Sequence, residues 1–370
     1  MLNLTSGGLS GGYRKYLQAM VPLLRADRRV DLLSVFIPPN AQRAKPGAEA
    51  FTWPEGDGRT GFRHLRRRLL EMAPDVVFIP TARWLDCGAS PVVVMVRNME
   101  PLLVPLEGNS LAAKAKNLAR ALSARRACRR ATRIIAVSEH VKDFLTGPWQ
   151  IPAARVGVVP HGAEAKLRPE EMVRPASLEL ASGEFIFTAG SIRPARGLRD
   201  IVEAAARIKK RGLPHHIVLA GAPDPDSEAY AAEMRRLAAR LGTADRICWA
   251  GQLQPGEMAW CLANCAAFVM TSRAEACPNT VLEALSYGCL SVSTDQPPMP
   301  EFFGESAYYY RARDGEALAG RLVEALNAPL AERQAKRDAA ATRARCYDWK
   351  TTAERTLEEL EMAASSEKGR

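Results

Sequence analysis

SRAEACPNTVLEALSYG, residues 272–288, follows a short apolar run and leads into a helical pattern. Glu275 lies in the connecting loop, and Glu283 follows eight residues later. A strand that leads through a short loop into a helix leaves the first N–H groups of the helix unpaired and points its positive dipole end at the loop. Such an end binds anions such as phosphate, whereas the carboxylates beside it accept hydrogen bonds from hydroxyl groups. The stretch therefore predicts a site for a ligand that carries both phosphate and hydroxyl groups, as a nucleotide sugar does.

The same residues also allow a structural interpretation. Thr280-x-x-Glu283 matches a capping box, in which the glutamate accepts a hydrogen bond from the backbone N–H of the threonine. Glu275 is equally compatible with a solvated loop. Both interpretations stay open on these residues alone, and the rest of the chain favours the ligand site.

Length and composition indicate two ordinary globular domains. A chain of 370 residues, 47% hydrophobic and 25% charged, is too long for one core and suits two domains of similar size. No apolar run reaches the roughly 18 residues that span a bilayer, and the N-terminus lacks the pattern of a signal peptide. The eight cysteines are scattered without zinc-site spacing. We therefore expect a cytoplasmic protein that needs no metal or cofactor.

The positive charge is concentrated in the first half of the chain. Residues 1–168 carry 26 Lys and Arg against 13 Asp and Glu, whereas the remainder is slightly acidic. Within that half, residues 111–133 predict a basic helix with an apolar stripe formed by Leu111, Ala115, Leu118 and Leu122. Such a helix either lies on an anionic membrane surface or packs on the sheet as an ordinary surface helix. Nucleic acid is not expected as a partner, because no aromatic residues alternate with these charges.

Short apolar runs alternate with helical patterns in both halves of the chain. This alternation is typical of parallel sheets with crossover helices, so we expect two doubly wound domains whose ligands bind at the carboxyl ends of strands. A Pro-, Glu- and Ser-rich segment at 166–183 is the expected boundary. The predicted strands are 30–37, 76–80, 92–96, 133–137 and 156–159 in the first half and 185–189, 217–220, 247–249, 267–270 and 290–293 in the second half.

Polar residues follow several of these strands. Gly190–Gly197 holds Arg193 and Arg196, which are suited to clamp a pyrophosphate through charge-assisted hydrogen bonds, although solvated loop arginines would give the same pattern. Because this loop and the Glu275 loop follow strands of one sheet, both can face the same crevice. In the first half, the candidate residues are the glycines of the 7–12 turn, including Gly11 and Gly12, then Arg97 and Asn98 after one strand, and His161 after another. A single histidine there is as compatible with packing as with binding.

Taken together, these loops resemble the retaining glycosyltransferases of family 4, also called glycosyl transferases group 1. The resemblance covers most of the chain. Glu275-x(7)-Glu283 looks like the E-x(7)-E motif of the family, and Gly190–Gly197 looks like its G-R-L-x-x-x-K-G loop. Residues 156–162 look like its segment ending in V-V-P-N-G, and residues 347–360 look like its tryptophan-led C-terminal helix. It implies an α/β GT-B fold, with two Rossmann-like domains facing across a cleft. The implied parts are an acceptor-side domain at 1–168, a donor-binding domain at 169–348, and a helix and tail at 349–370 that cross back to the first domain.

The resemblance also implies roles for individual residues. Glu275 would contact hydroxyls of the donor sugar, Glu283 the ribose hydroxyls, and Arg196, which stands where the family has lysine, would neutralise the diphosphate. Ser191 stands where the family has arginine, so that role passes to Arg193. His161 replaces an asparagine, and Arg97-Asn98 stands where many members have a histidine. The full assignment is catalytic Glu275, Arg193 and Arg196; donor-binding Gly190, Ala276, Cys277, Asn279, Thr280 and Glu283; and acceptor-side Gly11, Gly12, Arg97, Asn98 and His161.

The function implied by the resemblance is a retaining, metal-independent hexosyltransferase. It would move a sugar from a UDP- or GDP-sugar to a hydroxyl of a glycan or lipid-linked acceptor in cell-surface polysaccharide synthesis. Two alternatives remain. One is a sugar-nucleotide epimerase or phosphorylase on the same fold, and the other is a non-enzymatic protein that binds a membrane surface through 111–133. The basic helix also allows a peripheral location on the inner face of the membrane.

Overall fold

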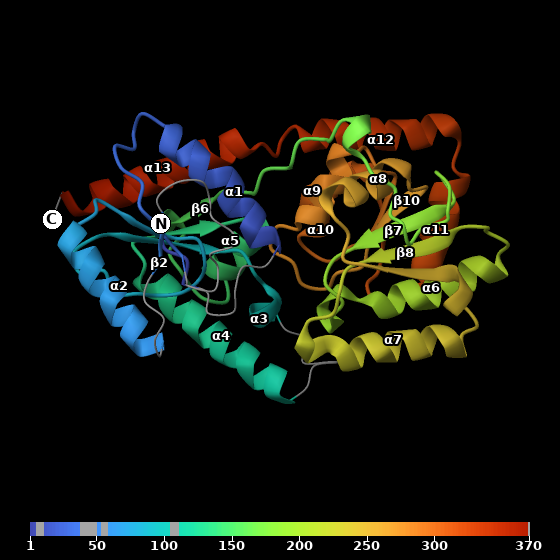
Figure 1. Ribbon diagram of the computed structural model, residues 1–370, viewed down its shortest axis with the longest axis horizontal. Helices are drawn as coiled ribbons and strands as arrows, with labels where there is room; N and C mark the ends of the chain where they lie inside the picture. Colours follow the sequence, from blue (N-terminus) through green and yellow to red (C-terminus); the bar gives the residue numbers. More distant parts are fainter. Residues whose placement is uncertain (5–10, 38–49, 53–57, 104–110, 369–370) are drawn as a thin grey trace. The chain divides into compact units, whose positions relative to one another are not determined.

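The computed structural model of the protein describes residues 1–4, 11–37, 50–52, 58–103 and 111–368. It contains two compact α/β units, each built on parallel strands (Figure 1). The two predicted α/β domains with parallel sheets are therefore confirmed. After Gly162 the chain enters the main part of unit 2, and it returns to unit 1 at Asp348. Unit 1 comprises Met1–Leu102, Leu118–Gly162 and Asp348–Arg370, and unit 2 comprises Leu103–Asn117 and Ala163–Tyr347.

The described part of unit 1 contains a parallel four-stranded sheet in the order β3-β4-β5-β6, together with a parallel pair, β1-β2. Residues 1–3 join the two, because Asn3 N–H donates to the Phe36 carbonyl at 2.9 Å and Leu2 N–H donates to the Phe78 carbonyl at 2.8 Å. Buried β-branched and aromatic residues give these runs their strand preference. The strands are β1 (Val35–Ile37), β2 (Ala50–Thr52), β3 (Val77–Ile79), β4 (Val92–Val96), β5 (Arg133–Ala136) and β6 (Val156–Val158), of which β2 was not predicted.

Six described helices accompany these strands. Ser138 caps α5 by accepting a hydrogen bond from the Val141 N–H at 3.3 Å, a common way to satisfy a helix start. None of the helices in the described parts of the chain is both long and apolar enough to cross a membrane. The helices are α1 (Gly11–Ala26), α2 (Gly58–Met72), α3 (Glu100–Leu103), α4 (Leu111–Arg130), α5 (Glu139–Thr146) and α13 (Trp349–Lys368).

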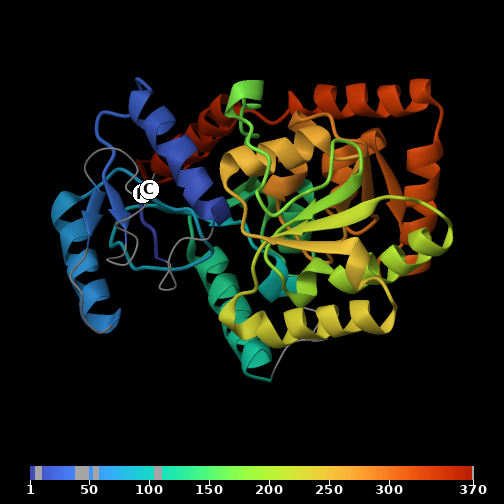
Figure 2. The ribbon, with the colours of Figure 1, turned by 45° about the vertical axis from the view of Figure 1, so that its right-hand side comes forward.

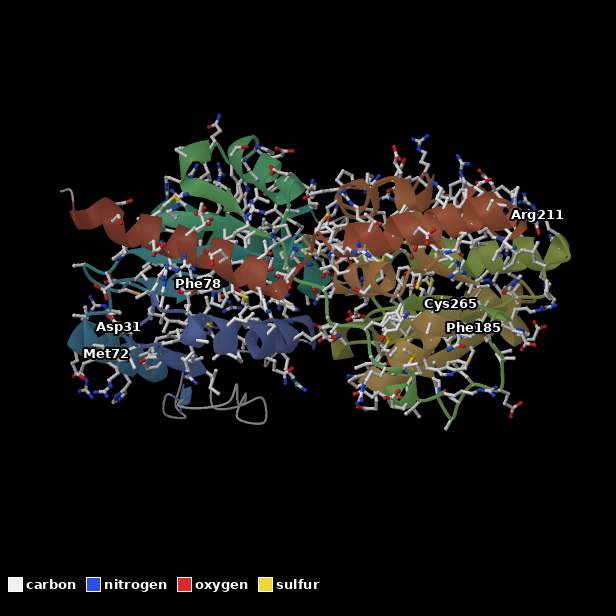
Figure 3. The ribbon with its side chains drawn as sticks, turned by 90° about the horizontal axis from the view of Figure 1, so that it is seen from above. Asp31, Met72, Phe78, Phe185, Arg211 and Cys265 are labelled. Atoms are coloured by element: carbon white, nitrogen blue, oxygen red, sulfur yellow. The ribbon has the colours of Figure 1, made fainter. Side chains whose placement is uncertain are left out.

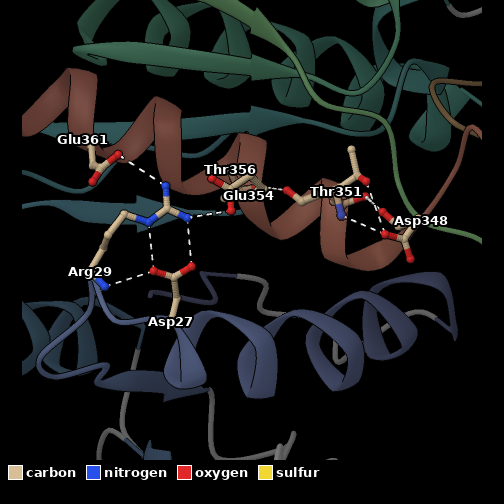
Figure 4. Close-up of polar contacts among 8 residues, drawn as sticks. Asp27, Arg29, Asp348, Thr351, Glu354, Thr356 and Glu361 are labelled. Atoms are coloured by element: carbon tan, nitrogen blue, oxygen red, sulfur yellow. Dashed lines mark hydrogen bonds and ion pairs between the residues drawn. The ribbon is translucent and has the colours of Figure 1, made fainter.

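The C-terminal helix α13 belongs to unit 1 and forms ion pairs with other parts of that unit. Arg29, which follows α1, donates to both carboxylate oxygens of Asp27 and to Glu354 on α13 at 2.9 Å (Figure 4). These pairs are partly exposed, so each contributes little to stability. A second pair, Arg133 to Glu359 at 2.7 Å, is largely shielded from solvent and fixes the register of the helix against β5.

The described part of unit 2 has a six-stranded parallel sheet in the order β12-β11-β10-β7-β8-β9. The chain builds outward in one direction from β7 to β9 and in the other from β10 to β12, so β7 and β10 flank the topological switch point where ligands of such sheets bind. The strands are β7 (Phe185–Ala189), β8 (His216–Ala220), β9 (Ile247–Gly251), β10 (Ala267–Met270), β11 (Ser291–Thr294) and β12 (Ala307–Tyr310), and β12 was not predicted.

Helices cover both faces of this sheet (Figures 1 and 2). Apolar residues of α6, α7 and α11 form a core with the strands on one face, whereas α8, α9, α10 and α12 lie on the other. Figure 3 marks Phe185 on β7, which is fully buried and stacks on Trp260 of α8 at 5.8 Å, and Phe78 on β3 in the unit 1 core. The helices are α6 (Leu198–Lys210), α7 (Glu228–Arg240), α8 (Pro255–Asn264), α9 (Asn279–Ser286), α10 (Met299–Phe303), α11 (Gly315–Asn327) and α12 (Leu330–Ala344).

Candidate active site

Two loops of unit 2 meet at the switch point. β7 and β10 are hydrogen-bonded neighbours, so the loops that follow them leave the sheet side by side. The loops are joined directly: the Arg273 N–H donates to the Ala195 carbonyl at 2.8 Å, and the Thr271 hydroxyl donates to the Arg196 carbonyl at 2.6 Å. The sequence expectation that these two loops face one place is confirmed by this geometry.

Arg196 and Glu275 are paired at this point. The guanidinium Nη1 lies 2.6 Å from Glu275 Oε1 and donates to the Ser272 hydroxyl at 3.2 Å. Both charged side chains are mostly buried, with 17% and 14% of their surface exposed. Gly190 makes room for them, because it has a φ of 144° and a Cβ there would lie 2.9 Å from Arg196 Cζ. A cation and an anion are thus held in contact at the carboxyl ends of β7 and β10.

The start of α9 completes this region. The helix begins at Asn279, and the residue before it, Pro278, makes no side-chain capping hydrogen bond. The capping-box interpretation is therefore wrong, since Thr280 lies inside the first turn rather than before it. The Thr280 hydroxyl is buried and has no hydrogen-bond partner among the described residues, and Glu283 lies half-buried one turn later. A helix start with a buried hydroxyl in its first turn is suited to ligand oxygens.

The other predicted donor-side residues surround the same place. Arg193 precedes the short 3₁₀ helix Pro194–Arg196 and is half-buried, while Ala276 and Cys277 are buried in the loop before α9. A small pocket opens between the two loops, lined by Thr188, Gly190, Arg196, Leu198, Thr271 and Ser272 among others. Gly190 and Arg196 are the predicted donor-side residues that line this pocket, and the roles of all the predicted residues toward a donor stay predictions.

A buried carboxylate next to these loops was missed by sequence reasoning. Asp200, in the first turn of α6, accepts hydrogen bonds from the Tyr310 hydroxyl at 3.0 Å and the Arg313 N–H at 2.9 Å, and it pairs with Arg273 at 3.6 Å. Burial raises the pKa of Asp200, and these three groups act against that rise by favouring the charged form. The sequence does not indicate this cluster, because Tyr310 belongs to β12, a strand that was not predicted.

In unit 1, the carboxyl ends of β4 and β6 lie against aromatic rings. Arg97 Cζ lies 4.2 Å from the ring centroid of Tyr13 and 5.7 Å from that of Tyr16, which are cation–π distances. His161 is only 3% exposed; its ring stacks on that of Trp349 of α13 at 6.0 Å and is tilted against that of Tyr16 at 5.2 Å. Burial raises the pKa of both tyrosines, and the Arg97 charge opposes that rise. His161 thus packs beneath α13, and its acceptor-side role stays a prediction.

The remaining acceptor-side predictions are less informative. Asn98 is exposed, and its side-chain oxygen accepts a hydrogen bond from the Glu100 N–H at 3.0 Å at the start of α3. Gly11 and Gly12 are the first residues of α1. Residues 7–10 of the glycine-rich turn lie outside the described residues. Nothing in these positions identifies an acceptor.

The basic helix α4 exposes its apolar stripe. Leu111, Leu118 and Leu122 are 83%, 63% and 62% exposed, whereas the helix is buried through other positions such as Ala127 and Cys128. The helix thus packs on unit 1 through residues outside the predicted stripe, and the three leucines of the stripe face solvent. Among the described residues, no group of three or more His, Cys, Asp or Glu side chains is arranged to hold a metal ion.

Comparisons with known proteins agree with this architecture. The family model described as "Glycosyltransferase Family 4" matches residues 11–167, and the one described as "Glycosyl transferases group 1" matches residues 171–344. Alpha-maltose-1-phosphate synthase of Mycolicibacterium smegmatis is 28% identical over 253 residues. That match spans 63% of this chain and 64% of the relative, which is less than two thirds of its length.

Solved structures show the same fold at low identity. HepE of Anabaena in complex with UDP-glucose has a TM-score of 0.76 and 17% identity, with 98% of this chain and 99% of that chain covered. WaaG, a glycosyltransferase involved in lipopolysaccharide biosynthesis, has a TM-score of 0.70 and 15% identity, with 97% and 98% covered. The two family models account for the two units in turn, and both structures have the same fold. The chain therefore belongs to the family 4, or group 1, glycosyltransferases and has their GT-B fold.

Proposed function

We propose that the protein is a retaining glycosyltransferase. It transfers a sugar from a UDP- or GDP-sugar to a hydroxyl group of a glycan or lipid-linked acceptor in cell-surface polysaccharide synthesis. One observation carries the proposal: the loops after β7 and β10 bring Arg196 and Glu275 into contact in unit 2, and the Glu275 loop leads directly into α9. This arrangement supplies positive charge for a diphosphate and a carboxylate for sugar hydroxyls. HepE contains UDP-glucose in a structure of the same fold, which favours a UDP-linked donor.

The proposed chemistry places the stabilising groups where charge develops. As the bond between the anomeric carbon and the diphosphate breaks, negative charge grows on the leaving phosphate oxygens. Arg196, Arg193 and the first N–H groups of α9 stabilise that charge more in the transition state than in the ground state. These cationic groups take the part that a metal ion plays in other transferases, so the proposed reaction is independent of a metal.

Retention follows if the acceptor attacks from the face that the diphosphate leaves. Glu275 is paired with Arg196 at 2.6 Å, and this pairing makes its carboxylate a poor nucleophile. The departing phosphate oxygen therefore takes the proton from the acceptor hydroxyl, and Glu275 orients the sugar through hydrogen bonds. This assignment leaves the anomeric configuration unchanged without a covalent sugar–enzyme intermediate.

Nucleotide release tests the proposal directly. The full-length protein is incubated with UDP- and GDP-sugars, and free nucleoside diphosphate is measured together with the raised melting temperature that a bound nucleotide produces. We expect one nucleotide to stabilise the protein and its sugar conjugate to release free nucleoside diphosphate slowly by hydrolysis. An epimerase would instead change the sugar without releasing nucleotide, and a phosphorylase would depend on added phosphate. Absence of both stabilisation and release for every nucleotide would contradict the proposal.

We further propose that the protein associates peripherally with an anionic membrane through α4, on the cytoplasmic face. The exposed leucines of α4 lie among Lys and Arg residues, and the two features together favour the surface of an anionic bilayer. Inserting three leucines contributes enough apolar burial for more than a tenfold gain in affinity. The triple variant Leu111→Ser, Leu118→Ser, Leu122→Ser should therefore sediment at least about tenfold less with phosphatidylglycerol vesicles than the wild type.

Two comparisons complete the vesicle experiment. Leu241 and Leu330 are exposed leucines of unit 2, so Leu241→Ser, Leu330→Ser is a matched control that should bind vesicles as the wild type does. Vesicles of phosphatidylcholine alone, or added salt, should weaken binding because the attraction to the basic helix is screened or absent. Equal binding by the triple variant and the control would contradict a role for α4.

A further inference from the structure

Asp200 is a buried carboxylate on which three parts of unit 2 converge. It lies in the first turn of α6 and is 1% exposed. One carboxylate oxygen accepts hydrogen bonds from the Tyr310 hydroxyl at the end of β12 and from the Arg313 N–H. The other oxygen faces the Arg273 guanidinium at 3.6 Å, and the Arg273 side chain is itself only 15% exposed. A charge this deeply buried destabilises a fold unless it is paired and hydrogen-bonded, and these three groups supply the partners of Asp200.

Arg273 lies between the two loops of the candidate active site. Its backbone N–H donates to the Ala195 carbonyl, which ties the Glu275 loop to the Arg196 loop. Its side chain lies against Gly197, where an added Cβ would come within 3.5 Å of Arg273 Nε and within 2.3 Å of the Thr271 carbonyl oxygen. The preceding residue, Ser272, accepts the hydrogen bond from Arg196. Ser272 and Glu275, which both contact Arg196, lie in the same segment as Arg273. Fixing Arg273 therefore also fixes these two contacts.

We propose that Asp200 and Arg273 are positioning residues that hold the two donor loops in register. Asp200 anchors the Arg273 guanidinium to α6 and β12, and Arg273 in turn sets the distance between Arg196 and Glu275. Neither side chain needs to touch the donor for this role. The proposal rests on the proposed function, since it assigns the pair to the same transfer reaction.

The expected effect differs from that of a pair that only supports the fold. Replacing both members of a buried ion pair with neutral residues of similar size is often harmless to stability. Asp200→Asn keeps an acceptor for Tyr310 and Arg313, and Arg273→Met keeps apolar bulk against Gly197. The double variant should therefore fold with a melting temperature near that of the wild type. It loses the side-chain ion pair that anchors the Glu275 loop to α6 and β12, while the backbone bond from Arg273 to Ala195 remains. The kcat for transfer or donor hydrolysis should therefore fall at least tenfold.

The decisive measurement compares the affinity for UDP with kcat in the same variant. The double variant should bind UDP with nearly wild-type affinity, because Arg193 and the start of α9 are unchanged, while kcat falls. Arg273→Lys keeps a cation opposite Asp200 and should restore most of the turnover lost in Arg273→Met. If the double variant does not fold, the comparison of Arg273→Lys with Arg273→Met tests the proposal in its place. Arg199→Met, Glu233→Gln is the matched control, because it removes an exposed ion pair between α6 and α7 and should change neither quantity.

The outcomes separate this proposal from the proposed function. A wild-type protein that neither binds UDP or GDP nor turns over their sugar conjugates would refute the function itself. An active wild type whose stable double variant has the same kcat would overturn the positioning role and leave the function in place. Equal turnover by Arg273→Met and Arg273→Lys would likewise overturn the positioning role.

Discussion

The Arg196→Ala variant should transfer sugar about two to three orders of magnitude more slowly than the wild type. The guanidinium is held by Gly190, Ser272 and Glu275 at the switch point of unit 2, where the proposed leaving diphosphate develops charge. Removing one preorganised donor from such a position costs roughly 3–4 kcal/mol of transition-state stabilisation. The rate of free-nucleotide release from the donor that the wild type uses gives the measurement, with and without acceptor.

The same variant should also bind the nucleoside diphosphate more weakly, by about one to two orders of magnitude, because a charge-assisted hydrogen bond contributes about 1.5–3 kcal/mol. Arg196→Lys is the matched control. The family motif that this loop resembles has a lysine here, so the lysine variant should stay within about tenfold of wild-type turnover. Because Arg196→Ala leaves Glu275 without its partner, the melting temperature must be followed in parallel. A folded alanine variant with wild-type turnover would remove Arg196 from the mechanism.

The convergence of the two donor loops was predictable from the sequence because it depends on local signals and one general rule. The runs that became β7 and β10 are largely apolar, and the carboxyl ends of parallel strands lie at the same edge of a sheet. Gly190 and the residues after Met270 follow those strand ends directly. Strand positions and polar strand ends therefore sufficed to bring Arg196 and Glu275 together.

Features that depend on contacts between distant parts of the chain could not be predicted in this way. Asp200 meets a residue of β12, whose Ala-Tyr-Tyr-Tyr sequence lacks the aliphatic run that marked the other strands. His161 follows a strand as expected, but the ring of Trp349 far along the chain packs over it. Local rules also compete with one another. Thr280-x-x-Glu283 fits a capping box with Thr280 as the cap, yet the capping position is Pro278, two residues earlier.

Replacing Glu275 with glutamine should separate catalysis from product binding. The amide keeps the shape of the side chain but removes the charge that pairs with Arg196 and that accepts hydrogen bonds from the sugar hydroxyls. Sugar contacts that strengthen in the transition state contribute several kcal/mol in glycosyl transfer reactions. We therefore expect turnover to fall about a hundredfold. The nucleoside diphosphate should bind at least as tightly as in the wild type, because Glu275 no longer competes with the diphosphate for Arg196.

Lower turnover together with undiminished binding of the nucleoside diphosphate shows that the Glu275 carboxylate competes with the diphosphate for Arg196. Weaker binding shows that it supports Arg196 instead. Calorimetry with UDP or GDP gives the dissociation constant, and nucleotide release gives the turnover, on the same preparation. Glu305→Gln is the matched control, since Glu305 is an exposed glutamate of unit 2 and its variant should change neither value. If Glu275→Gln bound the diphosphate clearly more weakly, the carboxylate would be serving to hold Arg196 in place for the phosphates rather than to compete with them. If its turnover equalled that of the wild type, neither Glu275 nor its ion pair would take part in transfer, and the proposed site would have to be abandoned.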